Sequence, residues 1–356
     1  MAFELGIYHF GELTPNPTTG IPPKPGVRLR ELIEQARAAD DAGLDVFAVG
    51  EHHRTDFAVS TPAVVLAAMA ENTRDIKLSS AVTVLSSDDP VRVFQQFATL
   101  DLISGGRAEI IAGRGSYTES FPLFGYDLHD YADLFAEKLD LLLRLREENP
   151  VTWHGTMRPP LNQGDITPQP DRELPVWVAV GGTAASVVRA ARQGLPLSLA
   201  IIGGSYVHFR PFVDLYRQTA EESGHDPARM KVSINSPGFI AASHREAIEV
   251  SHPYFQAGWM ANHHQRGRGV PMPRAAYEAQ SSAAGAFFLG STQEVIDTIM
   301  AQYQLFRHDR MMIQLGYGDV PQKEMLKAID LLGSEVAPVV RKEIASLEDA
   351  TTEARA

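Results

Sequence analysis

Short apolar runs alternate with longer segments of helical periodicity along most of the chain. Several of the short runs are apolar at nearly every position, which is typical of strands buried on both faces of a parallel sheet. Eight such strands are predicted, beginning near Phe3, Leu44, Ile76, Arg107, Val176, Leu195, Lys231 and Arg310. Strands that alternate with helices in this number predict an α/β fold, a (β/α)8 TIM barrel. A doubly wound sheet is the alternative, because a strand count from one sequence is easily wrong by one or two.

The segments between these strands carry signals for helix starts and ends. Residues 27–43 place apolar side chains on one face and end at a glycine, which suits the position after a helix. Asp89, followed by proline, is typical of an N-cap with proline at the first helical position. Ser291 and Glu294 fit a capping box. A further helix is predicted over residues 131–146.

The chain is longer than a minimal barrel requires. It has 356 residues, whereas a typical barrel has roughly 250. The excess lies in proline-rich insertions after strand 1 (residues 14–26), before strand 5 (150–175) and between strands 7 and 8 (261–285). We therefore expect a single barrel domain over residues 1–345 and a frayed tail over 346–356.

The charge balance and the absence of long apolar runs limit the partners. The chain carries 32 Lys and Arg against 44 Asp and Glu, a net charge of −12. An acidic surface repels nucleic-acid phosphates and anionic lipid heads, so neither nucleic acid nor membrane is expected as a partner. The N-terminus lacks the pattern of a signal peptide, and no apolar run approaches the roughly 20 residues of a membrane span. We expect a cytoplasmic protein.

The sequence contains no cysteine. This excludes disulfides, thiolate nucleophiles, cysteine-bound zinc and iron–sulfur clusters. A metal would need His, Asp or Glu ligands, but the His-x-His pattern that hydrolase barrels carry after strand 1 is absent, and His9 stands alone there. No metal is expected, and a metal-dependent hydrolase is a distant alternative.

The first motif with candidate chemistry is Glu51-His52-His53, directly after the second predicted strand. Titratable residues at the C-terminal end of a barrel strand are typical of catalytic groups. Adjacent residues point in opposite directions, so at most one of the two histidines is expected to face a pocket squarely. The structural alternative is a buried hydrogen-bonded cluster that anchors a loop.

The second motif runs from Asp101 to Arg107 and into the fourth strand, which ends at Gly113-Arg114-Gly115. Glycine at a strand end lets a flat ring or a phosphate approach the backbone, and Arg114 offers a forked donor for an oxyanion. A simple turn is the alternative, because the pattern lacks the third glycine of a dinucleotide fingerprint.

The third motif is Gly181-Gly182-Thr183 with Ser186, where the fifth strand meets a helix. Free backbone N–H groups, the helix dipole and two hydroxyls favour a monophosphate site. No lysine follows, so a nucleoside-triphosphate loop is not expected. The alternative is that Thr183 is only an N-cap.

The basic segment 263–268 is a further candidate, either as a lid over the substrate or as a solvated loop. Tyr117 and His9 are lesser candidates.

The order and spacing of these motifs resemble the bacterial luciferase-like flavin monooxygenases. The resemblance covers roughly residues 3–342, including the closing segment 289–295 and a helix that starts near Pro321. It implies a barrel that binds reduced FMN at its C-terminal face, usually as a homodimer. By position it also implies that the FMN phosphate is held by Arg114, Gly181, Gly182, Thr183 and Ser186.

The resemblance assigns three further positions. The Ala81–Val82 bond falls where the family often has a non-prolyl cis peptide beneath the flavin ring. His52 matches the family's catalytic histidine, with Glu51 and His53 beside it. Gly113 stands where the light-emitting members have a reactive cysteine, so light emission from a long-chain aldehyde is not implied.

The resulting hypothesis is an FMN-dependent monooxygenase that uses reduced flavin and O2 to oxygenate a small or medium organic substrate, with His52 as acid or base. No second dinucleotide-binding segment is found, so a separate NAD(P)H:flavin reductase is expected to supply the reduced flavin. One alternative is a deazaflavin-dependent hydride-transfer enzyme. The long acidic tail of its cofactor would need several basic residues near the phosphate turn, where the sequence has only Arg189 and Arg192. The other alternative is a non-catalytic flavin-binding protein.

Overall fold

The computed structural model describes residues 3–265, 271–282 and 284–353. Eight parallel strands form the barrel: β1 (Glu4–His9), β2 (Val46–Val49), β3 (Lys77–Ser80), β5 (Ala108–Gly113), β8 (Val176–Val180), β9 (Leu197–Ala200), β10 (Val232–Ile240) and β12 (Arg310–Leu315). Strand β10 pairs with both β9 and β12, and β12 pairs with β1, which closes the ring. These are the eight expected strands, and the TIM-barrel prediction is confirmed.

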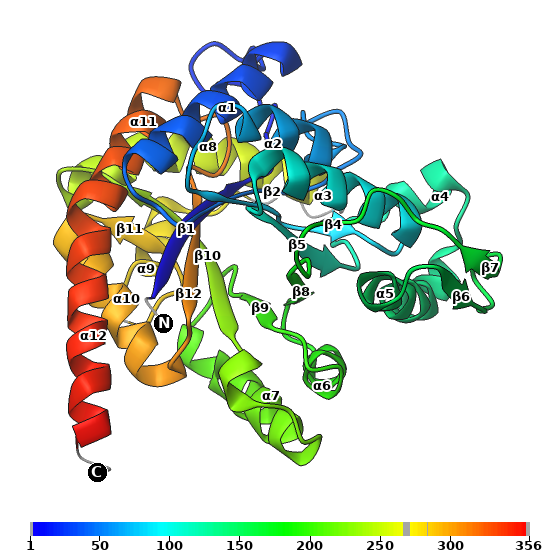
Figure 1. Cartoon of the computed structure of the whole chain (residues 1–356). Helices are drawn as coiled ribbons and strands as arrows, with labels where there is room; N and C mark the ends of the chain where they lie inside the picture. The colour runs from blue at the N-terminus through cyan, green and yellow to red at the C-terminus, as the bar shows by residue number, and fades with distance from the viewer. Residues whose placement is uncertain (1–2, 266–270, 283, 354–356) are drawn as a thin grey trace.

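Helices surround this barrel (Figure 1). The long ones are α1 (Pro25–Asp41), α2 (Pro62–Ala70), α3 (Pro90–Ser104), α5 (Tyr131–Glu147), α6 (Ala184–Arg192), α7 (Arg210–Glu222), α8 (His244–Gln265), α10 (Thr292–Phe306), α11 (Gln322–Leu331) and α12 (Ala337–Glu353). The short elements are β4 (Thr83–Val84), α4 (Ser120–Phe124), α9 (Arg274–Ala279) and β11 (Phe288–Gly290). Within the described part of the chain, no helix is both long and apolar enough to cross a membrane.

The expected helix signals are present in the structure. The Asp89 carboxylate accepts hydrogen bonds from the first amides of α3, which begins at proline. Ser291 and Glu294 form both hydrogen bonds of a capping box at α10. Gly43, after α1, has φ 76°, a conformation that glycine adopts without the steric cost of a Cβ.

Two insertions contain more regular structure than expected. The one before β8 forms an antiparallel hairpin of β6 (Val151–Trp153) and β7 (Leu161–Gly164), which lies beyond α5 in Figure 1. Trp153 Nε1 donates to Asp140 of α5 at 3.2 Å, which fixes the hairpin to that helix. The insertion between β10 and β12 contains the end of α8 and the whole of α9, and β11 follows it. The side chains of the basic segment 263–268 lie outside the described residues.

The C-terminal tail differs from the expectation. Helix α12 continues through residue 346 to Glu353, where a frayed tail was predicted. Tyr303 Oη of α10 donates to Glu348 at 3.1 Å, and Leu347 packs against the hydrophobic core. Residues 354–356 lie outside the described part of the chain.

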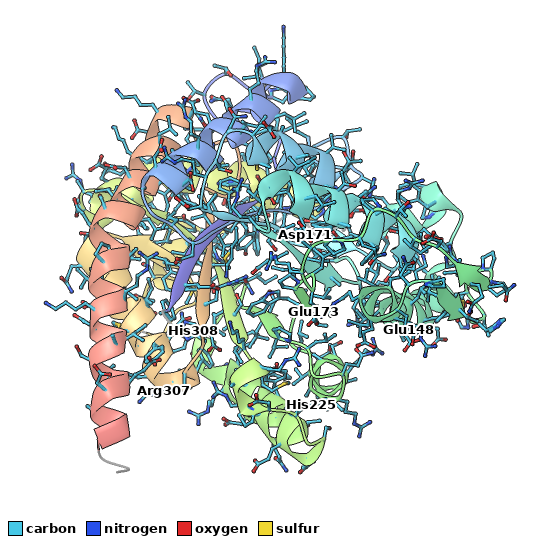
Figure 2. The ribbon with its side chains drawn as sticks, in the orientation of Figure 1. Glu148, Asp171, Glu173, His225, Arg307 and His308 are labelled. Atoms are coloured by element: carbon cyan, nitrogen blue, oxygen red, sulfur yellow. The ribbon has the colours of Figure 1, made fainter. Side chains whose placement is uncertain are left out.

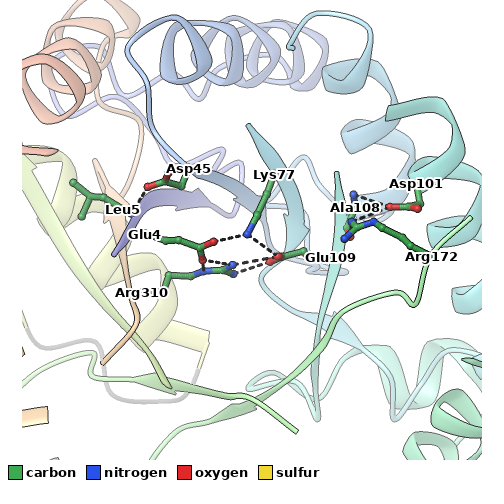
Figure 3. Close-up of polar contacts among 9 residues, drawn as sticks. All are labelled: Glu4, Leu5, Asp45, Lys77, Asp101, Ala108, Glu109, Arg172 and Arg310. Atoms are coloured by element: carbon green, nitrogen blue, oxygen red, sulfur yellow. Dashed lines mark hydrogen bonds and ion pairs between the residues drawn. The ribbon is translucent and has the colours of Figure 1, made fainter. Parts of the chain in front are cut away.

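The barrel interior is ionic at its N-terminal end. Arg310 is 1% exposed and pairs with Glu109 at 2.7 Å and with Glu4 at 2.6 Å (Figure 3). Lys77 also contacts both carboxylates. The Arg310 guanidinium lies 4.4 Å from the ring centroid of Trp177. This network of two cations and two carboxylates occupies the N-terminal end of the barrel interior.

The Asp101 to Arg107 motif lies at this N-terminal end. Arg107 donates to Thr73 Oγ1 and to the carbonyls of Ala70, Thr73, Ile76 and Ser104, at 2.8 to 3.2 Å. Asp101 accepts from the amide of Ala108 and from Arg172 (Figure 3). The motif therefore joins α2, α3 and two strands, and it contributes to structure and not to the site.

His308 is buried just before β12 without a hydrogen-bond partner among the described residues. It is labelled in Figure 2, and its ring packs against Phe3 at 5.2 Å and Tyr303 at 5.9 Å between centroids. Neither ring nitrogen bonds to a described residue. Burial, with the charge of Arg217, lowers the pKa of His308 to about 3. The folded protein therefore keeps this imidazole neutral.

We expect His308→Phe to make the protein less sensitive to acid. The unfolded imidazole binds a proton below pH ~6.5, whereas the folded one stays neutral down to pH ~3. The stability that His308 contributes is thus present above pH 6.5 and is lost as the pH falls toward 3, at about 1.4 kcal/mol per pH unit. Between pH 7.5 and 5, denaturant unfolding should show the variant losing about 2 kcal/mol less than the wild type. Identical pH slopes would contradict the assignment.

Candidate active site

A cavity of about 380 Å³ opens at the C-terminal end of the barrel. Its size is typical of small-molecule sites. All eight barrel strands, or the loops that follow them, contribute to its lining. The predicted site residues that line it are Glu51, His52, His53, Ala81, Val82, Gly113, Arg114, Gly181 and Thr183. Gly182 and Ser186 belong to the same turn as Gly181 but lie just outside the lining.

His52 lies in an aromatic wall of this cavity. The ring centroids of Phe57, Phe10 and Tyr117 lie 4.2, 4.8 and 4.8 Å from the centroid of the imidazole. Burial, together with the charge of Arg54, lowers the pKa of His52 to about 3. The imidazole is therefore neutral at physiological pH, and it offers one N–H donor and one nitrogen acceptor.

His53 also lines the cavity, although strand alternation predicted that one histidine would turn away. The reason is that β2 ends at Val49, so the alternation of a strand does not extend to these positions. His53 Nε2 lies 2.7 Å from Glu51 Oε1, and its ring packs against the edge of Phe124. The two histidines thus have different partners: an aromatic wall for His52 and a carboxylate for His53.

Glu51 connects the end of β2 to the segment after β3. Its backbone amide donates to Val82 O at 3.2 Å, and its carboxylate accepts from the amide of Val84 at 2.9 Å. The Ala81–Val82 peptide bond is cis, as the resemblance implied. A Cβ at Gly113 would lie 2.6 Å from Val82 Cγ2, so only glycine permits this close approach. Glu51 and Gly113 together fix the backbone at residues 81–84 as a shelf in the cavity.

The phosphate motifs meet at the start of α6. Arg114 lies over the Tyr131 ring at 5.0 Å, and Arg189 lies over Phe135, one turn further along α5, at 5.7 Å. Burial and the charge of Arg114 lower the pKa of Arg189, and its buried Nη1 has no hydrogen-bond partner among the described residues. Thr183 Oγ1 donates to Ser186 Oγ at 2.8 Å. Arg114, from the loop after β5, and Arg189, from the last turn of α6, thus bring two cationic groups within reach of each other's charge beside this turn, which suits a phosphate.

The backbone around this turn leaves room for such a group. A Cβ at Gly181 would meet no atom within 4 Å, so open space lies next to the amides of the turn. Gly182 has φ 101°, which glycine adopts most readily. The residues present therefore fit the phosphate of a flavin mononucleotide. Arg189, which the sequence suggested only for the alternative cofactor, belongs to the same cluster.

The polar floor of the cavity is not evident from the sequence. Tyr8, Ser198, Asn235 and Gln314 line it from inside the barrel. Asn235 Nδ2 donates to Ser198 Oγ at 2.9 Å and its Oδ1 accepts from Ser233 at 3.2 Å. The available signal was the alternation along β9, β10 and β12, which places Ser198, Asn235 and Gln314 on the inner face.

Two loops and the end of helix α8 are joined behind His52. Tyr117 Oη, from the loop after β5, donates to Asn262 Oδ1 of α8 at 2.7 Å. Asn262 Nδ2 in turn donates to Tyr317 Oη, from the loop after β12. The end of α8 is therefore tied to the loop whose Tyr117 packs against His52. Within the described residues, no group of three or more His, Asp and Glu side chains is arranged to hold a metal ion.

Comparison with known proteins places this architecture in one family. Residues 3–309 match the family model for luciferase-like monooxygenases. An uncharacterized protein from Sinorhizobium fredii is 26% identical over 338 residues, 90% of this chain and 94% of the relative. An alkanal monooxygenase alpha chain from the Kryptophanaron alfredi symbiont is 28% identical over 200 residues, 56% of each chain. The oxygenase component of a trigonelline monooxygenase from Acinetobacter baylyi is 24% identical, over 81% of this chain and 83% of the relative.

Solved structures show the same fold. A monooxygenase from Streptomyces bottropensis superposes with a TM-score of 0.80 at 22% identity, over 94% of this chain and 99% of the other. The oxygenating constituent of 3,6-diketocamphane monooxygenase from Pseudomonas putida, in complex with FMN, gives 0.75 at 18% identity, over 95% and 99%. An F420-dependent secondary alcohol dehydrogenase gives 0.70 at 19% identity, over 96% and 99%. On its sequence and its fold, the chain belongs to the luciferase-like flavin-dependent monooxygenase family.

Proposed function

We propose that this protein uses reduced FMN and O2 to oxygenate a small or medium organic substrate. The observation that carries the proposal is the juxtaposition of a phosphate cradle, a backbone shelf and a neutral histidine within one cavity of about 380 Å³. The reduced flavin, when bound, supplies the electrons that activate O2. The protein supplies binding, orientation and a proton donor or acceptor.

The two ends of the cavity have different tasks. Arg114 and Arg189, with Thr183, Ser186 and the amides of the turn at Gly181, hold the phosphate. The shelf at residues 81–84 supports the flat ring, and Glu51 is a positioning residue because its two hydrogen bonds fix that shelf. His53 keeps the Glu51 carboxylate in place through their contact at 2.7 Å.

His52 has the role of acid or base. Because its imidazole is neutral, it can hold a proton at one ring nitrogen and accept another at the second. The rings of Phe10, Phe57 and Tyr117 pack around it and make this side of the cavity apolar, which limits the access of water. Exclusion of water favours oxygen transfer to the substrate over loss of the activated oxygen as peroxide.

We also infer that a separate NAD(P)H:flavin reductase supplies the reduced FMN. The trigonelline relative, which is named as an oxygenase component, supports a division of labour between two proteins.

A homodimer is the proposed assembly, and the surface of α2 and α3 supports it. A groove of about 410 Å³ runs between these helices, and Arg92 is the one charged residue among the described residues that line it. Three large apolar side chains at or near the groove are exposed, Val64 at 66%, Leu102 at 41% and Ile103 at 47%. Exposed apolar surface of this kind is typical of protein contacts.

Arg114→Ala should weaken FMN binding about 10- to 100-fold, because a hydrogen bond between charged groups contributes about 1.5–3 kcal/mol. Riboflavin, which lacks the phosphate, should bind both proteins equally. Fluorescence titration with FMN, riboflavin and deazaflavin F420 measures these affinities. Arg192→Ala, on α6 but outside the cavity lining, is the matched control. Unchanged FMN affinity in the Arg114 variant would rule out the phosphate assignment, and tighter binding of F420 than of FMN would favour the hydride-transfer alternative.

A further inference from the structure

Three polar side chains on the cavity floor have hydrogen-bonding atoms that no described residue satisfies. Tyr8, Ser198 and Gln314 are 5%, 3% and 2% exposed, and all three line the cavity. Tyr8 and Gln314 are direct neighbours in the register of β1 and β12. These atoms are reached from the cavity, so a ligand bound there can pair with them.

Gln314 presents its carbonyl to the cavity. Its Nε2 donates to Glu12 Oε1 at 3.0 Å, and Glu12 is itself 3% exposed behind the floor. The amide nitrogen of Gln314 therefore faces Glu12, whose pKa burial raises to about 7; the ionised form of this carboxyl can only accept the hydrogen bond. Gln314 Oε1 is then left as an acceptor, and none of the described residues donates to it.

Tyr8 and Ser198 present donors. No hydrogen bond joins Tyr8 Oη to a described residue, and burial, with the charge of Glu12, raises the pKa of Tyr8, so the phenol keeps its proton. Ser198 Oγ accepts from Asn235 Nδ2, which leaves its own O–H free to donate. The floor therefore offers one acceptor and two hydroxyl donors.

The charge of this floor excludes an anion. None of the described side chains that form it is cationic, and Arg114 belongs to the phosphate cradle at another part of the lining. Glu12 lies directly behind Gln314, and its buried carboxyl, whose pKa is raised to about 7, supplies no positive charge to the floor. A carboxylate or sulfonate placed here would be buried without a counter-charge, which is costly. The group that fits is neutral, with its own donor and acceptor.

We propose that Tyr8, Gln314 and Ser198 bind an uncharged group in which an N–H donor lies beside a carbonyl, as in a lactam or an imide. The N–H donates to Gln314 Oε1, and the carbonyl accepts from the Tyr8 or Ser198 hydroxyl. This deepens the proposed function, since the group belongs either to the uracil-like edge of the flavin ring or to the organic substrate. The flavin edge and such a substrate present the same hydrogen-bonding groups, so different probe molecules are needed to tell them apart.

Methylation of the N–H distinguishes the sources. If the floor binds the flavin edge, the wild type should bind riboflavin about tenfold more tightly than N3-methylriboflavin, because one hydrogen bond is lost. If it binds the substrate, FMN-loaded protein should bind 2-quinolone, a neutral lactam, about tenfold more tightly than N-methyl-2-quinolone. In either case Gln314→Leu should abolish the preference. The proposal is overturned if neither pair shows a preference, or if a preference survives in Gln314→Leu.

Two further variants separate recognition from simple disruption. Glu12→Gln frees the Gln314 amide to rotate, so the preference for the N–H compound should fall although Gln314 is unchanged. Ser120→Ala removes a cavity-lining hydroxyl away from the floor, and the preference should remain. Circular dichroism confirms that each variant is folded. Failure of the wild type to bind any flavin would contradict the proposed function instead, so the two failures are distinguishable.

Discussion

Replacing His52 by alanine should lower the rate of oxygen transfer about 10²- to 10⁴-fold, which is the usual contribution of a positioned acid or base. The affinity for oxidised FMN should change little, because the phosphate cradle lies elsewhere in the cavity. The rings of Phe10, Phe57 and Tyr117 hold the imidazole in one orientation, so an alanine leaves no other group to take its place.

Single-turnover reactions of the reduced, FMN-loaded protein with O2 measure this effect. Product and hydrogen peroxide are quantified together, and the His52 variant should release peroxide in place of product. His52→Gln keeps a hydrogen-bonding group of similar reach, and it should recover part of the rate if hydrogen bonding by the imidazole contributes more than proton transfer does. Wild-type product yield in His52→Ala would show that the imidazole takes no part in oxygen transfer.

The low pKa of His52 has a consequence for the pH profile. With a pKa of about 3, the imidazole in the free protein does not titrate between pH 5 and 8. The pH profile of the oxygen-transfer rate should therefore have no inflection near pH 6.5 that depends on His52. The wild type and His52→Ala should have profiles of the same shape in this range. Such an inflection would mean that substrate or flavin binding raises the pKa of the imidazole into the physiological range.

The sequence revealed the barrel because its strands are uniformly buried. Strands such as β5 and β10 are buried at every position, so they are apolar along most of their length and stand out from the helices. The hairpin of β6 and β7 was missed because β7 (Leu161–Gly164) is half exposed and largely polar. β11 has three residues, too few for any periodicity. Elements that bury little surface leave little trace in a hydrophobicity pattern.

The site was predictable where residues cluster in the sequence, and not where they are brought together by barrel closure. Glu51, His52 and His53 are consecutive at a strand end, so their role at the cavity could be inferred from position alone. Gln314 and Tyr8 lie more than 300 residues apart and meet only because β12 pairs with β1. The second motif is divided by the fold: Asp101 and Arg107 lie at the end of the barrel opposite the cavity, whereas Gly113 and Arg114, to which its chemistry was assigned, line the cavity.

The ionic network at that opposite end should dominate the response of stability to mutation. Arg310→Met leaves Glu109, which is 4% exposed, with Lys77 at 3.6 Å as its one remaining cation among the described residues. Removing one partner of a buried ion pair typically costs about 3–5 kcal/mol. We expect a loss of this size in the free energy of unfolding, measured by denaturant titration. Arg341→Met, at a half-exposed pair with Asp45, is the control and should cost less than about 1 kcal/mol.

A double variant separates the cost of the unpaired charge from the value of the pair. Arg310→Met with Glu109→Leu leaves Lys77 to neutralise Glu4, which it contacts directly. Because well-packed apolar residues often replace a buried ion pair at little cost, the double variant should recover most of the stability that the single variant loses, to within about 1 kcal/mol of wild type. If the double variant instead loses as much stability as the two single variants together, the attraction within the network exceeds the cost of desolvating its charges. The contact of the Arg310 guanidinium with the Trp177 ring, at 4.4 Å, would be the additional attraction.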